Sequence, residues 1–357
     1  MEKRLVLVIN SGSMTTRVAL FEGESELCSE ELQHDPAEIE ACGGVLGQLP
    51  LRRAAVEEFL SRHESDGAVS CVACRGVPVK PVKAGTYLID RVLVDDLMNL
   101  RVATVHVSIL SALIGWEIAE RLGVKAYFTD PICVDEFIPE ARITGRPEIE
   151  RKSLWHALNC RAVLRRCCRE HGFDSSSSNF IVVHLGSGIT VACFEKGRAI
   201  DVCNANSESP FSPERSGSLP FQGLVEFCYD SGLSKKEMIY LLQKKSGFLA
   251  WLGTNDLREV ERMVDSGDEK AALIYSAFVY NLAKSICSYA ACVCGKVDGI
   301  VLTGAMARSG RLVEKVSERV SFLGRIFVYP GQDEMEALAY GALQADTGAA
   351  PAFRYEP

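Results

Sequence analysis

The sequence predicts an α/β protein made of two duplicated domains, each with a mixed sheet flanked by helices. Strand-like apolar runs alternate along the chain with helix-like stretches, which is the pattern of α/β folds. A strand–turn–strand unit occurs twice, at residues 5–22 and 180–195, and this internal repeat indicates the duplication. A further predicted strand, at residues 299–302, runs into a small-residue turn of the same kind at Gly304.

The first half alternates apolar runs with turn residues. Amphipathic spacing predicts a helix at residues 51–62 and another at 108–122, which Gly123 would end. The last strand of this half runs into Thr129-Asp130-Pro131. Strands are expected at residues 5–9, 18–21, 69–73 and 124–128.

The middle of the chain predicts a long helix from Pro147 to about His171. Proline is favoured at the first helical position, and Glu148 and Glu150 suit the positive end of a helix dipole. The second copy of the repeat follows this helix. Apolar residues at steps of three and four then indicate a helix at about residues 268–294. A last helix is expected at about residues 333–345, after Pro330-Gly331.

Size and charge narrow the class of protein. A chain of 357 residues can form two domains with their own cores. The net charge of −8 gives no electrostatic case for nucleic acid or an anionic membrane, and no apolar run approaches the ~20 residues of a transmembrane helix. The chain opens with a short apolar strand rather than a signal-peptide core, so we expect a cytoplasmic protein.

The 14 cysteines are scattered, mostly among apolar neighbours. We interpret them as reduced structural thiols, because cytosolic cysteines behave as small buried hydrophobes. Cys71-Val-Ala-Cys74 has the spacing of a redox pair, and a role for it stays open.

Both copies of the repeat place glycine and serine in the turn and a polar residue, Asn10 or His184, near the end of the first strand. Such turns bring backbone N–H groups close to phosphate oxygens. Two of them, one per domain, could hold a polyphosphate across a cleft, which indicates phosphoryl transfer. The turn residues predicted to bind phosphate are Gly12, Ser13 and Thr16 in the first copy and Gly186, Ser187 and Gly188 in the second.

Six blocks of the sequence are specific enough to compare with known families. They are Asp130-Pro131 to Glu136, Pro147 to Asn159, His184-Leu-Gly186, Phe211 to Gly217, Leu252 to Asp256 and Pro330 to Ala337. With these blocks the chain resembles the butyrate kinases of the acetate kinase family, within the wider actin-like (ribonuclease H-like) ATPase fold of sugar kinases and heat-shock chaperones. The resemblance runs from residue 5 to about 345.

The resemblance implies reversible phosphoryl transfer from ATP to a short-chain carboxylate, giving an acyl phosphate and ADP. A carboxylate is already ionised at neutral pH, so the reaction needs cations and hydrogen-bond donors rather than a general base. By resemblance, Arg75 and Arg215 lie at the carboxylate and the moving phosphoryl group, His184 donates to the transition state, and Asp130 orients the reactants. From local sequence alone, alternatives remain open. The two arginines could form surface salt bridges, His184 could be a structural histidine, and Asp130 could be a turn residue.

The same resemblance places Asn10 and Glu334 near Mg²⁺, although Glu334 also suits the first turn of a helix. Gly304 and Ala305 are assigned to the adenosine, while Asn204 and Asp256 are weaker candidates on the nucleotide side. Residues 1–147 with the C-terminal helix at about 333–357 would form the acyl-substrate and phosphate domain, and residues 148–332 the nucleotide-binding domain. A homodimer or higher homo-oligomer is expected.

The sequence departs from the family where glycine is usual, at Val77, Ser187, Ser218 and Ala305. Val77, together with Ile109, is expected to reshape the acyl pocket. Alternatives to butyrate therefore remain: propionate, isobutyrate or acetate as substrate, or a nucleotide-binding paralogue without turnover. The complete polar set, Asn10, Arg75, Asp130, His184, Arg215 and Glu334, favours a working enzyme.

Overall fold

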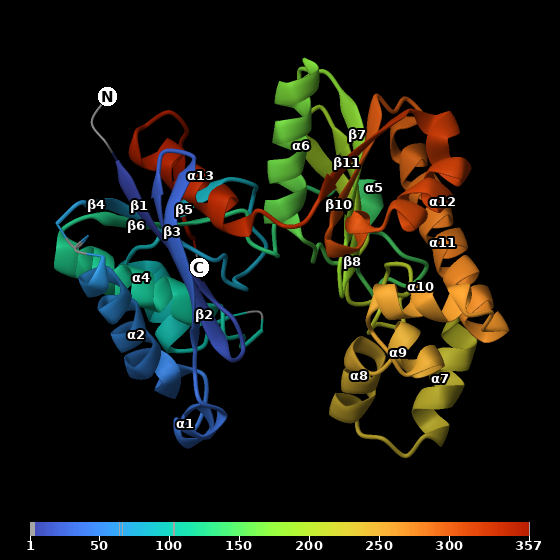
Figure 1. Ribbon diagram of the computed structural model, residues 1–357, viewed down its shortest axis with the longest axis horizontal. Coiled ribbons are helices and arrows are strands. Elements are labelled where there is room, and N and C mark those ends of the chain that lie inside the picture. Colours follow the sequence, from blue (N-terminus) through green and yellow to red (C-terminus); the bar gives the residue numbers. More distant parts are fainter. Residues whose placement is uncertain (1–3, 64, 66, 103, 357) are drawn as a thin grey trace. The chain divides into compact units, whose positions relative to one another are not determined.

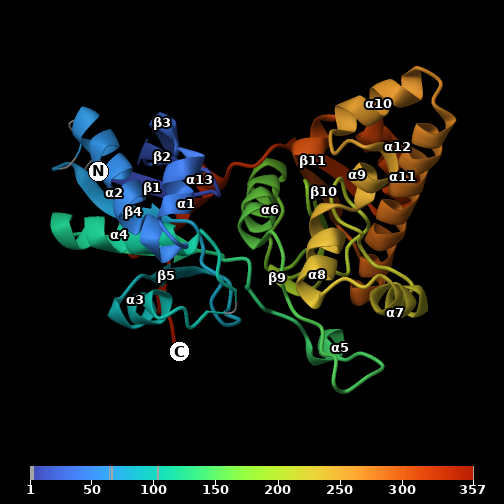
Figure 2. The same ribbon diagram turned by 90° about the horizontal axis from the view of Figure 1, so that it is seen from below.

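The computed structural model describes residues 4–63, 65, 67–102 and 104–356. The predicted first domain also includes residues 1–3, 64, 66, 103 and 357, which lie outside the described residues. The chain divides into two compact units (Figures 1 and 2). Unit 1 comprises Met1–Asp135 with Asp333–Pro357, and unit 2 comprises Glu136–Gln332.

Unit 1 is built on a seven-stranded sheet of order β12-β5-β6-β4-β1-β2-β3. Strands β1, β4 and β6 run parallel, while β2 and β3 continue from β1 as antiparallel hairpins. The strands are β1 (Leu5–Ser11), β2 (Thr15–Glu22), β3 (Ser25–Gln33), β4 (Val69–Cys74), β5 (Thr86–Leu88), β6 (Lys125–Thr129) and β12 (Ala352–Arg354).

Helices cover both faces of this sheet (Figure 1). Helix α4 packs on one face at Gly115, where an added Cβ would meet the Cys74 sulfur. Helix α13 packs on the opposite face at Gly341, beside Thr129. Cys71 and Cys74 are three residues apart on β4, so their side chains point to opposite faces and both thiols are free. The helices are α1 (Pro36–Ala41), α2 (Leu49–Arg62), α3 (Arg91–Met98), α4 (Ile109–Leu122) and α13 (Glu334–Asp346).

Unit 2 has a five-stranded sheet of order β11-β10-β7-β8-β9. Helix α6 (Ala157–His171) covers one face, and α11 (Glu269–Ala290) with α12 (Gly310–Val320) covers the other (Figure 1). The remaining elements are β7 (Asn179–Leu185), β8 (Ile189–Glu195), β9 (Arg198–Val202), β10 (Gly299–Gly304), β11 (Arg325–Pro330), α5 (Pro139–Arg142), α7 (Phe221–Asp230), α8 (Lys235–Lys244), α9 (Gly247–Leu252) and α10 (Leu257–Asp265).

The two units repeat one topology, as the sequence predicted. The order β6-β4-β1-β2-β3 in unit 1 matches β11-β10-β7-β8-β9 in unit 2, with the same parallel and antiparallel pairings. The first hairpin closes at Ser11↔Thr16 and the second at Leu185↔Ile189, so the second turn is one residue shorter.

The predicted long helix from Pro147 was wrong at its start, because α6 begins only at Ala157. The preceding segment is irregular and crosses unit 2 with Arg151 donating to the carbonyl oxygens of Ala141 and Val202. These tertiary partners, with an ion pair to Asp201, hold the segment out of a helix despite its favourable N-terminal residues.

Candidate active-site clusters in the two units

Three parallel strands of unit 1 end side by side, and each carries a predicted site residue there. Asn10 lies near the end of β1, Arg75 directly follows β4 and Asp130 directly follows β6. The carboxyl ends of neighbouring parallel strands meet at one edge of a sheet, which is where open α/β sheets bind ligands. Asp130 has a positive φ of 40° and accepts a hydrogen bond from the Gly85 N–H at 2.7 Å.

Asn10 joins two other predicted residues. Its Nδ2 donates to Glu334 Oε2 at 3.1 Å, and its Oδ1 accepts from Arg75 Nη1 at 3.2 Å. Glu334 opens α13, so its carboxylate also lies at the positive end of a helix. We call Asn10, Arg75, Asp130 and Glu334 the unit 1 cluster.

The turn between β1 and β2 rests on Arg52, a residue that the sequence analysis missed. Arg52 lies on α2, is fully buried, and donates to backbone oxygens of this turn. Its neighbour Arg53 is half-exposed and pairs with Glu117. Nothing in the local sequence distinguishes the two arginines, so only the fold reveals which one supports the predicted phosphate turn.

In unit 2, Asn159 of α6 sets the tautomer of His184. Asn159 Nδ2 lies 2.9 Å from His184 Nδ1 and can only donate, so Nδ1 accepts and the ring proton sits on Nε2. Burial, and secondarily the Arg215 charge, lowers the pKa of His184 to about 4. The imidazole is therefore neutral at pH 7 and presents one N–H donor.

That donor faces the second predicted phosphate turn. A Cβ at Gly186 would lie 2.8 Å from His184 Nε2, and a Cβ at Gly188 would lie 2.7 Å from Arg215 Nη1. Side chains at these positions would occupy the space beside both groups, so glycine keeps the turn open to a ligand. We call His184, Gly186–Gly188 and Arg215 the unit 2 cluster.

Arg215 has no carboxylate partner in the described part of the chain. Its Nη1 donates to the Ala205 carbonyl at 2.7 Å and to Asn206 Oδ1 at 2.8 Å. Burial lowers the pKa of Arg215, yet the guanidinium of arginine stays protonated in proteins. A buried guanidinium held by neutral oxygens is available to an anionic ligand.

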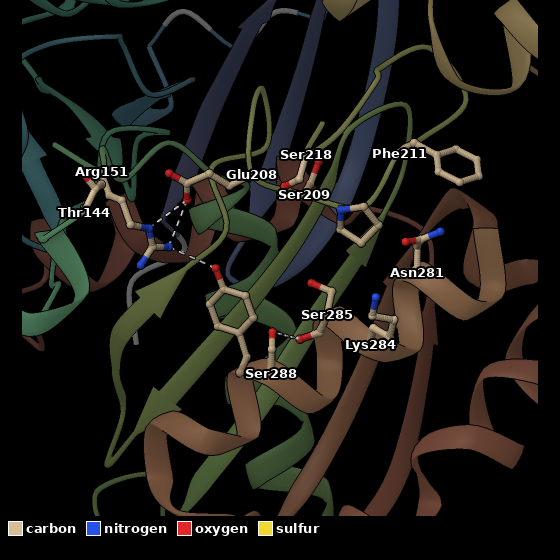
Figure 3. A pocket seen from close by; sticks show the side chains of 12 residues that line it. Thr144, Arg151, Glu208, Ser209, Phe211, Ser218, Asn281, Lys284, Ser285 and Ser288 are labelled. Carbon is tan, nitrogen blue, oxygen red and sulfur yellow. Dashed lines mark hydrogen bonds and ion pairs between the residues drawn. The ribbon is translucent and has the colours of Figure 1, made fainter. Parts of the chain in front are cut away.

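A second arginine holds the segment that positions Arg215. Arg151 pairs with Glu208 at 3.0 Å and with Asp201 at 2.9 Å, and Glu208 also accepts from the Asn204 N–H at 3.2 Å. Figure 3 shows the Arg151–Glu208 pair on the wall of a cavity of about 610 Å³ beside α11. Asn204 directly precedes Ala205 and Asn206, which accept hydrogen bonds from Arg215. The ion pairs of Arg151 therefore stabilise the segment that positions Arg215.

Gly304 and Ala305 lie at the neighbouring strand end. Gly304 exchanges two backbone hydrogen bonds of 3.0 Å with Gly331, and its φ of 92° favours glycine. Ala305 lines a cavity of about 650 Å³ together with Gly186 and Ser187 of the predicted phosphate turn. The cavity therefore joins the residues predicted for phosphate and for adenosine. Its other lining residues are Pro213, Glu214, Asn255, Asp256, Leu257, Arg258, Glu261, Met306, Arg308 and Ser309.

Comparisons with known proteins identify the family of this chain. The acetokinase family model matches residues 155–332. "Probable butyrate kinase 2" of Caldanaerobacter subterraneus subsp. tengcongensis is 42% identical over 344 residues, which is 96% of this chain and 97% of the relative. The chain belongs to the acetokinase family.

Solved structures of an acetate kinase and of a propionate kinase show the same fold. Porphyromonas gingivalis acetate kinase has a TM-score of 0.78 at 22% identity, covering 96% of this chain and 99% of its own. A propionate kinase from Francisella tularensis has a TM-score of 0.77 at 17% identity, with the same coverages. A ROK family protein from Streptococcus pneumoniae is more distant, with a TM-score of 0.53 at 12% identity over 96% of this chain and 99% of its own. The predicted actin-like ATPase fold is confirmed.

As a member of the acetokinase family, the protein is a phosphotransferase that uses a carboxyl group as acceptor and works with ATP and ADP. Its described helices include none that is both long and apolar enough to cross a membrane.

Proposed function

We propose that the protein catalyses butyrate + ATP = butyryl phosphate + ADP, reversibly and by direct in-line transfer. The butyrate assignment is supported by the 42% identical relative named as a probable butyrate kinase. The structural support is the unit 2 cluster, where a neutral Nε2–H donor and an arginine without a carboxylate partner among the described residues lie at a glycine turn.

In this proposal the enzyme stabilises charge rather than removing a proton. The carboxylate attacks as the anion, while Arg75 and Arg215 offset the repulsion between that anion and the phosphoryl oxygens. His184 donates from Nε2 to an oxygen of the transferring group. Asp130, held by Gly85, orients the reactants. The carboxylate oxygen–phosphorus bond forms as the bond from phosphorus to ADP breaks.

In this proposal each turn binds phosphate, through Gly12 and Ser13 in unit 1 and through Gly186, Ser187 and Gly188 in unit 2. Thr16, which was also predicted to bind phosphate, is buried and bonded to Arg52 and His34, so it supports the unit 1 turn instead. The adenosine lies at Gly304 and Ala305, in the cavity that Ala305 lines with the second turn. Residues 1–147 with the C-terminal helix thus serve the acyl substrate, and residues 148–332 serve the nucleotide.

Mg²⁺ would be held by Asn10 and Glu334. Asn10 Nδ2 donates to Glu334 Oε2 at 3.1 Å, so the two side chains meet, and Asn10 Oδ1 with the Glu334 carboxylate would supply the oxygen ligands that Mg²⁺ prefers while it keeps several waters. Bound there, the ion would neutralise phosphate charge.

We place the protein in the cytoplasm. Its fourteen free cysteines suit this reducing compartment, where ATP is also available.

The test is acyl phosphate formation, trapped with hydroxylamine, from Mg-ATP and straight or branched C2 to C6 acids. We expect an optimum at butyrate that His184→Ala and Arg215→Ala both abolish. An optimum at acetate, propionate or isobutyrate would make that acid the substrate and leave the proposed type of reaction unchanged. Nucleotide binding without product from any acid would contradict the proposal and indicate a paralogue without turnover.

We further infer a homodimer formed through α7 and α8. Helix α7 contains no buried residue, and two of its aromatic side chains, Phe221 and Tyr229, are 82% and 85% exposed. On α8, Tyr240 is 56% exposed. With Phe227, these rings offer about 500 Å² of apolar surface, a large share of the ~800 Å² that each partner buries in a stable interface. Light scattering should give a dimer that Phe221→Glu with Tyr229→Glu dissociates, and a monomeric wild type would contradict it.

A further inference from the structure

Arg52 is a fully buried cation surrounded by neutral oxygens. In the described part of the chain it makes no ion pair. Its Nε donates to Gln48 Oε1 at 3.1 Å, and its Nη2 donates to the Ser13 carbonyl at 2.7 Å. Its Nη1 donates to the carbonyls of Gly12 at 3.0 Å and Thr15 at 2.8 Å and to Thr16 Oγ1 at 3.1 Å. A buried charge is costly unless it is paired. The arginine therefore lacks the anion that would offset its charge.

The carbonyls of the β1–β2 turn all point away from its tip. Those of Gly12, Ser13 and Thr15 accept from Arg52, and that of Met14 accepts from the His34 N–H at 3.0 Å. The N–H groups of Ser13 and Met14 lie at the exposed tip and have no partner among the described residues. Consecutive N–H groups that face outward over a buried cation form a concave site for an anion.

We propose that Arg52 is the positioning residue of this turn: it holds the carbonyls inward so that the N–H groups of Ser13 and Met14 bind a phosphate. Its positive charge attracts the anion through the turn without direct contact. The catalytic consequence rests on the proposed function, whereas phosphate binding by the turn does not.

His34 also contacts the β1–β2 turn, without adding a second charge beneath it. Its Nε2 lies 2.9 Å from Thr16 Oγ1, and burial, followed by the Arg52 charge, lowers its pKa. A neutral His34 leaves Arg52 as the cation under the turn. The matched control is Arg53, which is adjacent on α2 but half-exposed and paired with Glu117.

The experiment measures inorganic phosphate binding, by calorimetry and by the phosphate-induced rise in Tm. Arg215→Gln serves as the background, because it removes the guanidinium at the unit 2 turn. We expect Arg52→Gln to weaken the remaining phosphate binding about tenfold or more and Arg53→Gln to leave it within twofold. Arg52→Lys keeps the charge but loses the planar fork, so it should restore part of the affinity.

Activity with Mg-ATP and the preferred acid, measured with Arg215 intact, gives the second readout. Arg52→Gln should lower kcat/KM, and Arg52→Lys should recover part of it. A purely structural role would lower Tm in both Arg52 variants but leave the phosphate-induced increment of the folded protein unchanged, and that result would overturn the inference. An inactive wild type that still binds phosphate through Arg52 would contradict only the proposed reaction.

Discussion

Asn159 and His184 are joined by a buried hydrogen bond of 2.9 Å that leaves the imidazole proton on Nε2, beside Gly186. Asn159 Nδ2 also reaches Thr303 Oγ1 at 3.3 Å, which orients the amide. The pair thus connects α6 with the ends of β7 and β10. The donor that His184 offers to a ligand therefore depends on a residue from another element.

The first prediction reverses that tautomer. Asn159→Asp places an acceptor at Nδ1, which moves the proton there and leaves Nε2 without a hydrogen to donate. We expect kcat to fall about a hundredfold or more with little change in KM, the scale of losing one transition-state donor. Asn159→Ala should cost less, because it imposes no wrong tautomer. Nitrogen NMR of the ring reports the proton position, and a kcat for Asn159→Asp near wild type would disprove the assignment.

The second prediction concerns stability at low pH. The His184 pKa falls from 6.5 to about 4 on folding, so the unfolded chain binds the proton more readily. Stability from this group is present above pH 6.5 and is lost as the pH falls towards 4, by about 3 kcal/mol in total. Urea unfolding of wild type and His184→Gln at pH 7 and pH 5 should show a smaller loss in the variant. Equal losses would mean that His184 titrates normally.

The third prediction removes the support of Arg215. Arg151→Met leaves Asp201 and Glu208 without their cation, and breaking a partly buried ion-pair network of this kind costs about 3 kcal/mol. The loosened Asn204 segment should also raise KM for the carboxylate. Tm and KM are the measurements, with the exposed Arg146→Met as control. A lower Tm with unchanged KM would show that Arg151 serves stability alone.

The sequence predicted what depends on short-range pattern. The hairpins β1–β2 and β7–β8 are formed by neighbouring strands, so apolar runs and glycine turns were enough to reveal the repeat and the turns at Gly12 and Gly186. Asn10, Arg75 and Glu334 were identified through the family resemblance, and the structure brings them into contact.

The remaining features depend on long-range contacts. Arg52 and Arg53 are adjacent on one helix, and only its packing against the β1–β2 turn turns one of them inward. Asn159 has no local signal, since its partner lies on another element. The segment after Pro147 carries good helix-start residues, but the partners of Arg151 outweigh that local preference.

The last prediction addresses acyl selectivity at Val77, which the sequence analysis expects to reshape the acyl pocket. Val77 is fully buried two residues after Arg75, in a segment so close to Pro131 that a Cβ at Gly76 would lie 2.6 Å from its Cα. Val77→Gly should lower stability by about 2 kcal/mol through the lost side chain. It should also favour the longer acid, since one methylene in a pocket is worth 10- to roughly 200-fold in specificity.

The measurement is the ratio of kcat/KM for butyrate and acetate in wild type, Val77→Gly and Val79→Ala. Val79 is equally buried in the core of unit 1, so its variant should lower Tm and leave the ratio unchanged. A raised ratio in Val77→Gly alone would assign that side chain to the acyl pocket. The same factor on both acids would instead mean that Val77 contributes only to the core, and the selectivity of this enzyme would have to arise at other residues.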